Sequence, residues 1–301
     1  MRWRVGLAFT TLIVVACVAG CRGSTSGSSR FAPAAVDTGS VVVNGTHLFY
    51  EATGRGPAVV LLHSGDLDRR QWDPQFLSFA REHRIVRFDA RGYGHSGPAN
   101  SPFRADEDLY AFLVALHLPR ASLVGSSLGG RIAIDFALAH PSMVDRLVLA
   151  APGLSGWQFT RGDTSWLPEA RAARDRGDWG GIAVAWLKQD VMRAAMERPE
   201  LAAHLREVAR DNGPFWKDVV SQGGEKDEQG SPPALDRIKL VTAPTLLIVG
   251  TRDTRDIEGI ADTLNASMPN VRRVTFQGAG HMLNLEQADR FNTLVLDFLR
   301  R

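Results

Sequence analysis

Cysteine is nearly absent from this chain. Only Cys17 and Cys21 occur among its 301 residues, and both lie in the first 21. From residue 22 onwards the sequence therefore excludes a disulfide, a catalytic thiol and a thiolate metal site. A chain of this length buries enough apolar surface to fold without such cross-links.

An excess of charge of one sign is also missing. The chain has 35 Lys and Arg against 33 Asp and Glu, which gives a formal net charge of +2. Nothing in it forms a basic surface for a phosphate backbone, so we expect no nucleic-acid partner. It also lacks metal-ligand spacing and a phosphate-binding glycine loop, so we expect no metal and no cofactor.

Residues 1–21 are typical of an export signal. Arg2 and Arg4 precede an apolar stretch from Val5 to Ala19, which is about as long as the core of a signal peptide. A full membrane span needs roughly 20 apolar residues, so this stretch is short for one. An uncleaved membrane anchor remains the alternative.

The end of this segment, Val18-Ala19-Gly20-Cys21, resembles the lipobox of bacterial lipoproteins. In that motif the cysteine is lipidated and becomes the mature N-terminus. Residues 14–17 fit the motif loosely, but cleavage there would shorten the apolar core. Residues 22–39 follow with a Ser- and Gly-rich start typical of a flexible tether. The resemblance implies lipidation of Cys21 and an exported protein, lipid-anchored to a membrane of the cell envelope.

Strand-like and helix-like segments alternate over residues 40–152 and again over 241–301. A hairpin is predicted around Asn44-Gly45, and further strands at residues 58–62, 84–89, 122–125, 144–150, 243–250 and 272–276. Helices are expected at residues 71–82, 105–117, 128–140, 257–264 and 287–299. Such alternation predicts one α/β domain built on a mostly parallel sheet. Residues 153–240 interrupt it as a helix-biased insertion.

The sharpest motif is a serine between two glycines, Gly125-Ser126-Ser127-Leu128-Gly129. A predicted strand runs into it and a predicted helix runs out, which is the setting of a nucleophile elbow. The two glycines let the helix pass close to the strand. We therefore predict Ser127 as a nucleophile.

A serine hydroxyl needs a base, and that base needs a group to orient it. His281 is the candidate base, because it follows the last predicted strand in a loop at a sheet edge. The acid is expected between Ser127 and His281 in the chain, after a strand. Asp253 meets that condition, and Asp256 remains its rival.

An oxyanion hole is expected from two backbone N–H groups. One is that of Leu128. The other comes from the loop after residues 58–62, where Gly65 is the first candidate and Ser64 the alternative. His63 is predicted to hold this loop in place.

From about residue 40 to 301 the chain resembles the α/β-hydrolase superfamily. The resemblance rests on residues 61–65 with Trp72 downstream, on residues 89–96, on the elbow and on the loops of Asp253 and His281. It implies a structural role for Asp89, Arg91 and His95, and a helical cap for residues 153–240. Where many members have His-Gly, this chain has His63-Ser64.

A serine nucleophile restricts the reactions that the site could catalyse. Haloalkane dehalogenases and epoxide hydrolases of this fold use Asp where Ser127 stands, which leaves acyl transfer to water, namely ester, lactone, thioester or amide cleavage, or carbon–carbon bond hydrolysis. The His-Gly-Gly-Gly-Pro-Gly loop of many carbon–carbon hydrolases and proline iminopeptidases is missing, which disfavours both. We therefore expect a carboxylic-ester hydrolase, with a lactone or thioester as further substrates.

The insertion holds five of the seven Trp, and with Phe159, Phe215, Met192 and Met196 it suggests an apolar pocket. The same side chains also fit the core of the insertion itself. The expected partner is a small, largely apolar acyl substrate. Two alternatives remain, a non-catalytic anchored ligand-binding or sensory protein and an acyltransferase. The sequence carries no signal for an oligomeric state.

Overall fold

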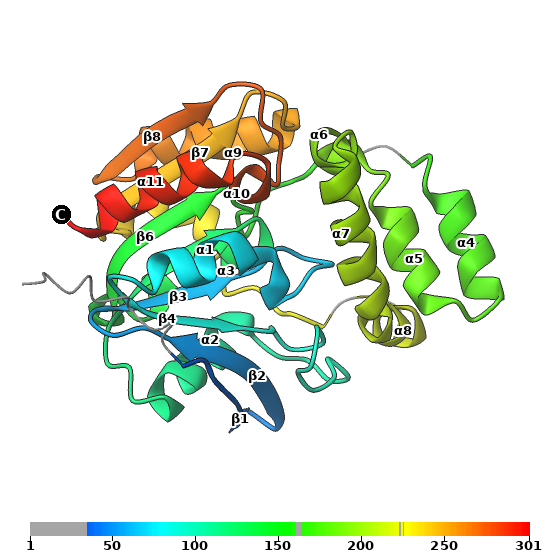
Figure 1. The fold of residues 1–301 in the computed structure, drawn as a ribbon, viewed down its shortest axis with the longest axis horizontal. Helices are drawn as coiled ribbons and strands as arrows, with labels where there is room; N and C mark the ends of the chain where they lie inside the picture. Colours follow the sequence, from blue (N-terminus) through cyan, green and yellow to red (C-terminus); the bar gives the residue numbers. More distant parts are fainter. Residues whose placement is uncertain (1–34, 161–163, 223, 225) are drawn as a thin grey trace, which may run out of the picture. The chain divides into compact units, whose positions relative to one another are not determined.

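A computed structural model of the chain describes residues 35–160, 164–222, 224 and 226–301. The predicted signal and Cys21 lie outside these residues. Eight strands form one sheet in the order β1-β2-β4-β3-β5-β6-β7-β8 (Figure 1). They span Asp37–Val43, Thr46–Thr53, Ala58–Leu62, Arg84–Phe88, Ala121–Ser126, Val144–Ala150, Thr245–Gly250 and Val271–Phe276 for β1 to β8. The pairs β1–β2 and β2–β4 are antiparallel and the other pairs are parallel. The predicted α/β-hydrolase fold with a mostly parallel sheet is confirmed.

The central strands are buried along nearly their whole length. Val59 to Leu62 of β3 and all of β5 are buried, as expected for parallel strands covered by helices on both faces. The predicted hairpin joins β1 to β2, and its turn residues Asn44 and Gly45 both have positive φ. That is the geometry of a tight type I′ turn. Strand β1 begins at Asp37, so residues 37–39 belong to the sheet and the predicted tether ends earlier than residue 39.

Six helices lie between or after the strands of the core. They are α1 (Asp73–Phe79), α2 (Ala105–Ala115), α3 (Leu128–Ala139), α9 (Arg255–Ser267), α10 (Leu283–Glu286) and α11 (Ala288–Leu299). Helix α1 packs against α11, and α2 against α3. Two predicted helices begin differently. A 3₁₀ turn at Arg69–Trp72 precedes α1, and the last predicted helix is preceded by the short helix α10.

In the described part of the chain between β6 and β7, five further helices form an insertion, drawn to one side of the sheet in Figure 1. They are α4 (Leu167–Asp175), α5 (Trp179–Trp186), α6 (Arg193–Met196), α7 (Pro199–Asp211) and α8 (Gly213–Gln222). An apolar cluster joins this insertion to the core, because Met192 and Val208 pack with Leu67 and Met282. Leu67 follows β3 and Met282 follows His281, so the insertion lies directly against two loops of the predicted site.

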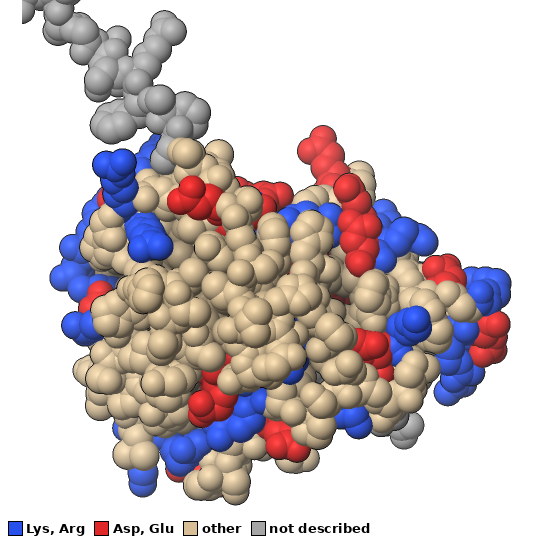
Figure 2. Space-filling view, turned by 90° about the horizontal axis from the view of Figure 1, so that it is seen from below, with Lys and Arg blue, Asp and Glu red and all other residues tan. Residues whose placement is uncertain are grey.

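Charges of both signs are mixed on the face drawn in Figure 2. Lys, Arg, Asp and Glu surround a broad central area that carries few of them. Within the described part of the chain, no helix is both long and apolar enough to cross a bilayer.

Candidate active site

Ser127 lies on a strained turn between β5 and α3. Its backbone has φ 51° and ψ −112°, a region that residues other than glycine rarely adopt. The glycines around it allow a very close approach of α3 to the sheet. A Cβ atom on Gly125 would lie 2.3 Å from the carbonyl oxygen of Gly129, and one on Gly129 would lie 2.2 Å from that of Leu62. The turn therefore requires glycine at both positions.

His281 and Asp253 lie together, although 28 residues separate them in the chain. The ring Nδ1 of His281 is 2.9 Å from Oδ2 of Asp253, and their side chains are only 3% and 2% exposed. A carboxylate in this position accepts a hydrogen bond from Nδ1–H, which keeps the proton on Nδ1 and leaves Nε2 free to accept one. The acid comes from the loop after β7 and the histidine from the loop after β8, which are neighbouring parallel strands.

Asp256, the rival acid, makes its hydrogen bonds to Trp157 and Thr160 of the insertion. It accepts hydrogen bonds from Trp157 Nε1 at 3.2 Å and from the N–H and Oγ1 of Thr160 at 3.1 and 2.5 Å. Burial opposes its charge, but these hydrogen bonds outweigh burial and hold the pKa of Asp256 below its usual value. Asp256 thus holds the segment that leads from β6 into the insertion.

Ser127, Asp253 and His281 all line one cavity of about 850 Å³. Its remaining wall comes from the insertion, the loop after β7 and the start of α9. Both side chains line this cavity, and the structure records no hydrogen bond between Ser127 and His281 among the described residues. No group of three or more metal-ligating side chains occurs in the described part of the chain.

The loop after β3 brings Gly65 to the elbow. A Cβ atom on Gly65 would lie 3.8 Å from Leu128 Cδ2, so the backbone of Gly65 faces the start of α3. The N–H of Ser64 donates to Gln71 Oε1 at 2.7 Å and is therefore not free to bind a substrate oxygen. The Ser64 hydroxyl contacts the Ser126 hydroxyl at 3.0 Å and ties the two loops together.

His63 is completely enclosed beside this loop. Its Nδ1 donates to the carbonyl of Ser64 at 2.7 Å, and its Nε2 accepts from the N–H of Ala90 at 2.9 Å. Burial lowers the pKa of His63, so the neutral ring is favoured. Both ring nitrogens are thus engaged with backbone, as expected of a residue that holds the loop.

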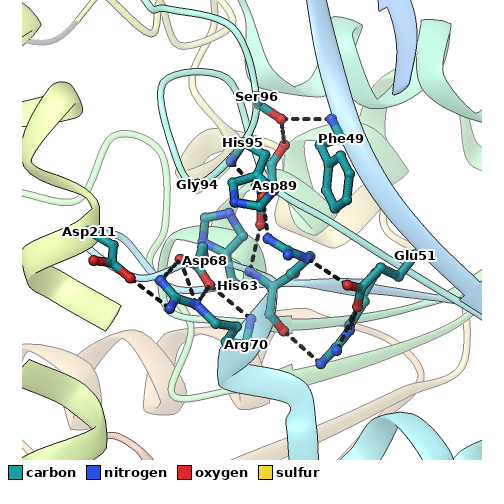
Figure 3. Close-up of polar contacts among 12 residues, drawn as sticks. Phe49, Glu51, His63, Asp68, Arg70, Asp89, Gly94, His95, Ser96 and Asp211 are labelled. Atoms are coloured by element: carbon teal, nitrogen blue, oxygen red, sulfur yellow. Dashed lines mark hydrogen bonds and ion pairs between the residues drawn. The ribbon is translucent and has the colours of Figure 1, made fainter. Parts of the chain in front are cut away.

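Asp89 lies at the centre of a polar network next to His63 (Figure 3). It accepts from the N–H and Nη1 of Arg69 at 2.9 and 2.8 Å, and from the N–H of His95 at 2.9 Å. Arg91 pairs with Asp108 at 2.7 Å. None of these residues lines the cavity of Ser127, which agrees with the structural role predicted for Asp89, Arg91 and His95.

The sequence interpretation missed the residues that support the site from behind. Gln71 accepts from Ser64 and donates to Asn284 Oδ1 at 3.3 Å, so one amide links the loop after β3 to α10. Glu286 accepts from the N–H groups of Gly280 and Met282, and burial raises its pKa. In the sequence, Asn284 and Glu286 alternate with apolar residues directly after His281. This alternation was the signal that could have indicated buried polar contacts there.

Two neighbouring residues of the insertion contact the loop of Asp253 and the helix α10 that follows His281. Glu197 pairs with Arg252, next to Asp253, at 2.6 Å. Arg198 donates to the carbonyl of Glu286, behind His281. The insertion and the Asp253–His281 pair are thus connected by polar contacts as well as by the apolar cluster.

The predicted apolar pocket is only partly present. Of the aromatic and Met side chains proposed for it, Phe159 and Trp186 line the cavity. Met192 and Met196 pack in the apolar cluster below it, and Phe215 stacks on Tyr93. Most of these side chains therefore pack inside the insertion or against the core, and do not line a substrate pocket. The sequence had left packing in the insertion open as the alternative.

Residues 59–294 match the sequence profile of the Alpha/beta hydrolase family. The chain belongs to this family. It is 30% identical to the serine hydrolase BPHL of Mus musculus over 275 residues, which cover 88% of this chain and 87% of that protein. It is also 30% identical to a 2-hydroxy-6-oxononadienedioate/2-hydroxy-6-oxononatrienedioate hydrolase of Burkholderia vietnamiensis, over 87% of this chain and 94% of that protein.

A solved structure shows the same family likeness in three dimensions. The enol-lactonase from Burkholderia xenovorans superposes with a TM-score of 0.69 at 27% identity, and the match covers 87% of this chain and 100% of that chain. These homologues of the protein are hydrolases.

Proposed function

We propose that this family member is a serine hydrolase that cleaves a carboxylic ester or lactone through an acyl-enzyme. Ser127 is the nucleophile, His281 the general base and Asp253 the residue that orients His281. The observation that carries the proposal is the buried 2.9 Å contact of His281 with Asp253. Ser127, on its strained turn, lines the same cavity as these two residues. The names of the relatives support hydrolysis as the reaction class.

In the first step, Ser127 Oγ attacks the carbonyl carbon and passes its proton to His281 Nε2. The N–H groups of Leu128 and Gly65 donate to the negative oxygen of the tetrahedral intermediate. His281 then returns the proton to the leaving alcohol. A water molecule repeats the sequence on the acyl-enzyme, which releases the acid and restores Ser127. Hydrogen bonds between nucleophile and base often tighten only once substrate is bound.

Ester or lactone cleavage is preferred to carbon–carbon cleavage because of the loop after β3. It reads His63-Ser64-Gly65-Asp66, without the glycine run typical of many carbon–carbon hydrolases. The relative named as an oxononadienedioate hydrolase keeps carbon–carbon cleavage as the second candidate. Assaying a short acyl ester beside a vinylogous diketone acid separates the two reactions.

Labelling of Ser127 tests the mechanism. A fluorophosphonate should modify the wild-type protein at Ser127 and inactivate it, while Ser127→Ala should neither label nor turn over an ester. Ser101→Ala, a change at an exposed loop serine, is the control and should label normally. A protein that binds esters but never labels would be the non-catalytic binding protein. Transfer of the acyl group to an added alcohol in preference to water would indicate an acyltransferase.

We further propose that the helical insertion is the cap over this site and that the mature protein is lipid-anchored through Cys21. The anchor rests on the lipobox-like residues 18–21 and on the Ser- and Gly-rich composition of residues 22–29, both outside the described residues. Cys21→Ser should abolish incorporation of labelled fatty acid, whereas the matched change Cys17→Ser should leave it intact. An intact mass with an unmodified Cys21 would remove the anchor and leave the enzyme proposal standing.

A further inference from the structure

The cavity at Ser127 is lined by charged side chains of both signs. There are six of them, namely Asp190, Arg193, Arg252, Asp253, Arg255 and Asp256. Four of these belong to the loop after β7 and the first turn of α9, and two belong to the insertion. A cavity with this lining does not fit the largely apolar substrate that the sequence suggested.

Most of these charges already have a partner. Arg193 pairs with Asp190 within the insertion, and Arg252 pairs with Glu197 at 2.6 Å. As described above, Asp253 is bound to His281 and Asp256 to Trp157 and Thr160. Their charges are therefore at least partly neutralised before any ligand enters.

Arg255 is the exception. Among the described residues, its guanidinium has no ion pair, hydrogen bond or aromatic partner, although it lines the same cavity as Ser127. It is the first residue of α9, where a cation opposes the helix macrodipole. Neither an ion pair nor the local stability of α9 explains an arginine at this position.

The neighbouring wall of the cavity is apolar. Phe159 lines it with 58% of its surface exposed, and Trp186, Val191 and Ile257 lie around the same space. A guanidinium binds a carboxylate through two parallel hydrogen bonds. Arg255 itself is exposed at the rim of the cavity, so its pairing with a carboxylate is strengthened only where a bound substrate and the apolar wall exclude water.

We propose that the substrate of this site is an anionic ester or lactone, whose free carboxylate binds Arg255 while its carbonyl lies at Ser127. This inference rests on the proposed function. The free carboxylate takes no part in the reaction: water cleaves the ester bond, and the anion stays on the product that carries it. The free carboxylate belongs either to the acyl part or to the alcohol part of the substrate. The test uses one pair of esters for each of these two possibilities.

The test compares an anionic ester with a neutral ester of the same shape. For the acyl part, the pair is 4-nitrophenyl hydrogen adipate and 4-nitrophenyl methyl adipate. For the alcohol part, it is 3-carboxyphenyl butyrate and 3-carbamoylphenyl butyrate. The measured quantity is the ratio of kcat/KM for the anionic ester to kcat/KM for its neutral partner, so general changes in activity cancel.

The wild-type protein should favour the anionic ester in one of the two pairs. Arg255→Gln should lower that ratio by about tenfold, the expected loss for one charge-assisted hydrogen-bonded contact near solvent. Arg255→Lys should restore part of it. Salt at about 1 M, where the Debye length is about 3 Å, should lower the wild-type ratio as well. Arg272→Gln is the matched control, because Arg272 is exposed on β8 and does not line the cavity.

The outcomes separate this inference from the function beneath it. If the neutral esters are cleaved and Arg255→Gln changes neither ratio, the anionic-substrate proposal is wrong and the hydrolase proposal stands. If neither member of any pair is cleaved and Ser127 does not label, the proposed function fails and this inference fails with it.

Discussion

Glu286 holds the backbone of His281 from both sides. Its carboxylate accepts from the N–H of Gly280 at 2.8 Å and from the N–H of Met282 at 3.1 Å, the two residues that flank the histidine. The Glu286 side chain is fully buried. Asp253 fixes the ring of His281 and Glu286 fixes its main chain, so the imidazole is positioned by two carboxylates with different tasks.

Glu286→Gln should lower kcat with little change in KM. Glutamine keeps one acceptor oxygen, but its amide group faces a backbone N–H as a second donor, and the loop must shift. A displacement of the base by about 1 Å costs as much as 10²-fold in rate. Because Glu286 does not line the cavity, substrate binding should be preserved. Steady-state kinetics check this, with the exposed Glu200→Gln as control; a rise in KM alone would contradict the positioning role.

Glu286 should also impose a pH dependence on stability. Burial raises its pKa above the ordinary value of 4.5, so in the window just above that value the folded state holds a proton that the unfolded state has released. The free energy of unfolding therefore falls as pH rises through this window and levels off above the raised pKa. In urea unfolding over this range, the unfolding free energy of the wild type relative to Glu286→Gln should fall as pH rises, because the other carboxyl groups contribute to both proteins alike. Equal slopes in both proteins would exclude the effect.

The two aspartates after β7 should behave differently when each is replaced by Asn. Asp253→Asn should reduce kcat by roughly 10⁴-fold, because the imidazole then loses the acceptor that fixes its tautomer. Asp256→Asn keeps one oxygen for Trp157 and Thr160 and should have a small effect by comparison. Rates measured on one soluble ester decide the matter, and the reverse ranking would make Asp256 the acid.

Asn212 should be a main polar link between the insertion and the core. Its Oδ1 accepts from the N–H of Gly94 at 2.7 Å, and its Nδ2 donates to Asp68 at 3.1 Å and to the carbonyl of Val208 at 2.8 Å. Asn212 is 1% exposed, and Asn212→Ala removes two buried hydrogen bonds, to Asp68 and to Val208, together with the one from Gly94. We expect a loss of about 1–3 kcal/mol in unfolding free energy.

Denaturant unfolding measures this loss. The control for it is Asn270→Ala, because the Asn270 amide makes one exposed hydrogen bond, to the carbonyl of Thr242. That change should cost less than about 0.5 kcal/mol, as is usual at the surface. Equal losses in the two variants would show that Asn212 is not a special contact.

Several features of the protein could be predicted because they depend on residues close together in the chain. The buried strand β3 follows from an unbroken apolar run, and the turn between β1 and β2 from Asn44-Gly45, since both patterns restrict the local backbone. The strained turn at Ser127 likewise follows from glycines that leave room for α3. The pairing of Asp253 with His281 was predicted from chain order and from its place after a strand, with Asp256 left as the rival, and the structure brings Asp253 and His281 together.

Only the tertiary structure determines which side chains meet when they lie far apart in the sequence. Gln71 occupies the N–H of Ser64 and reaches Asn284, which lies 213 residues further along. Asp256 is turned towards Thr160, and Arg255 has no partner among the described residues at the cavity. A sequence pattern shows which face of a strand or helix is buried, but it does not say which polar groups meet there. Those pairings depend on how the insertion packs on the core, and they set the charge of the cavity.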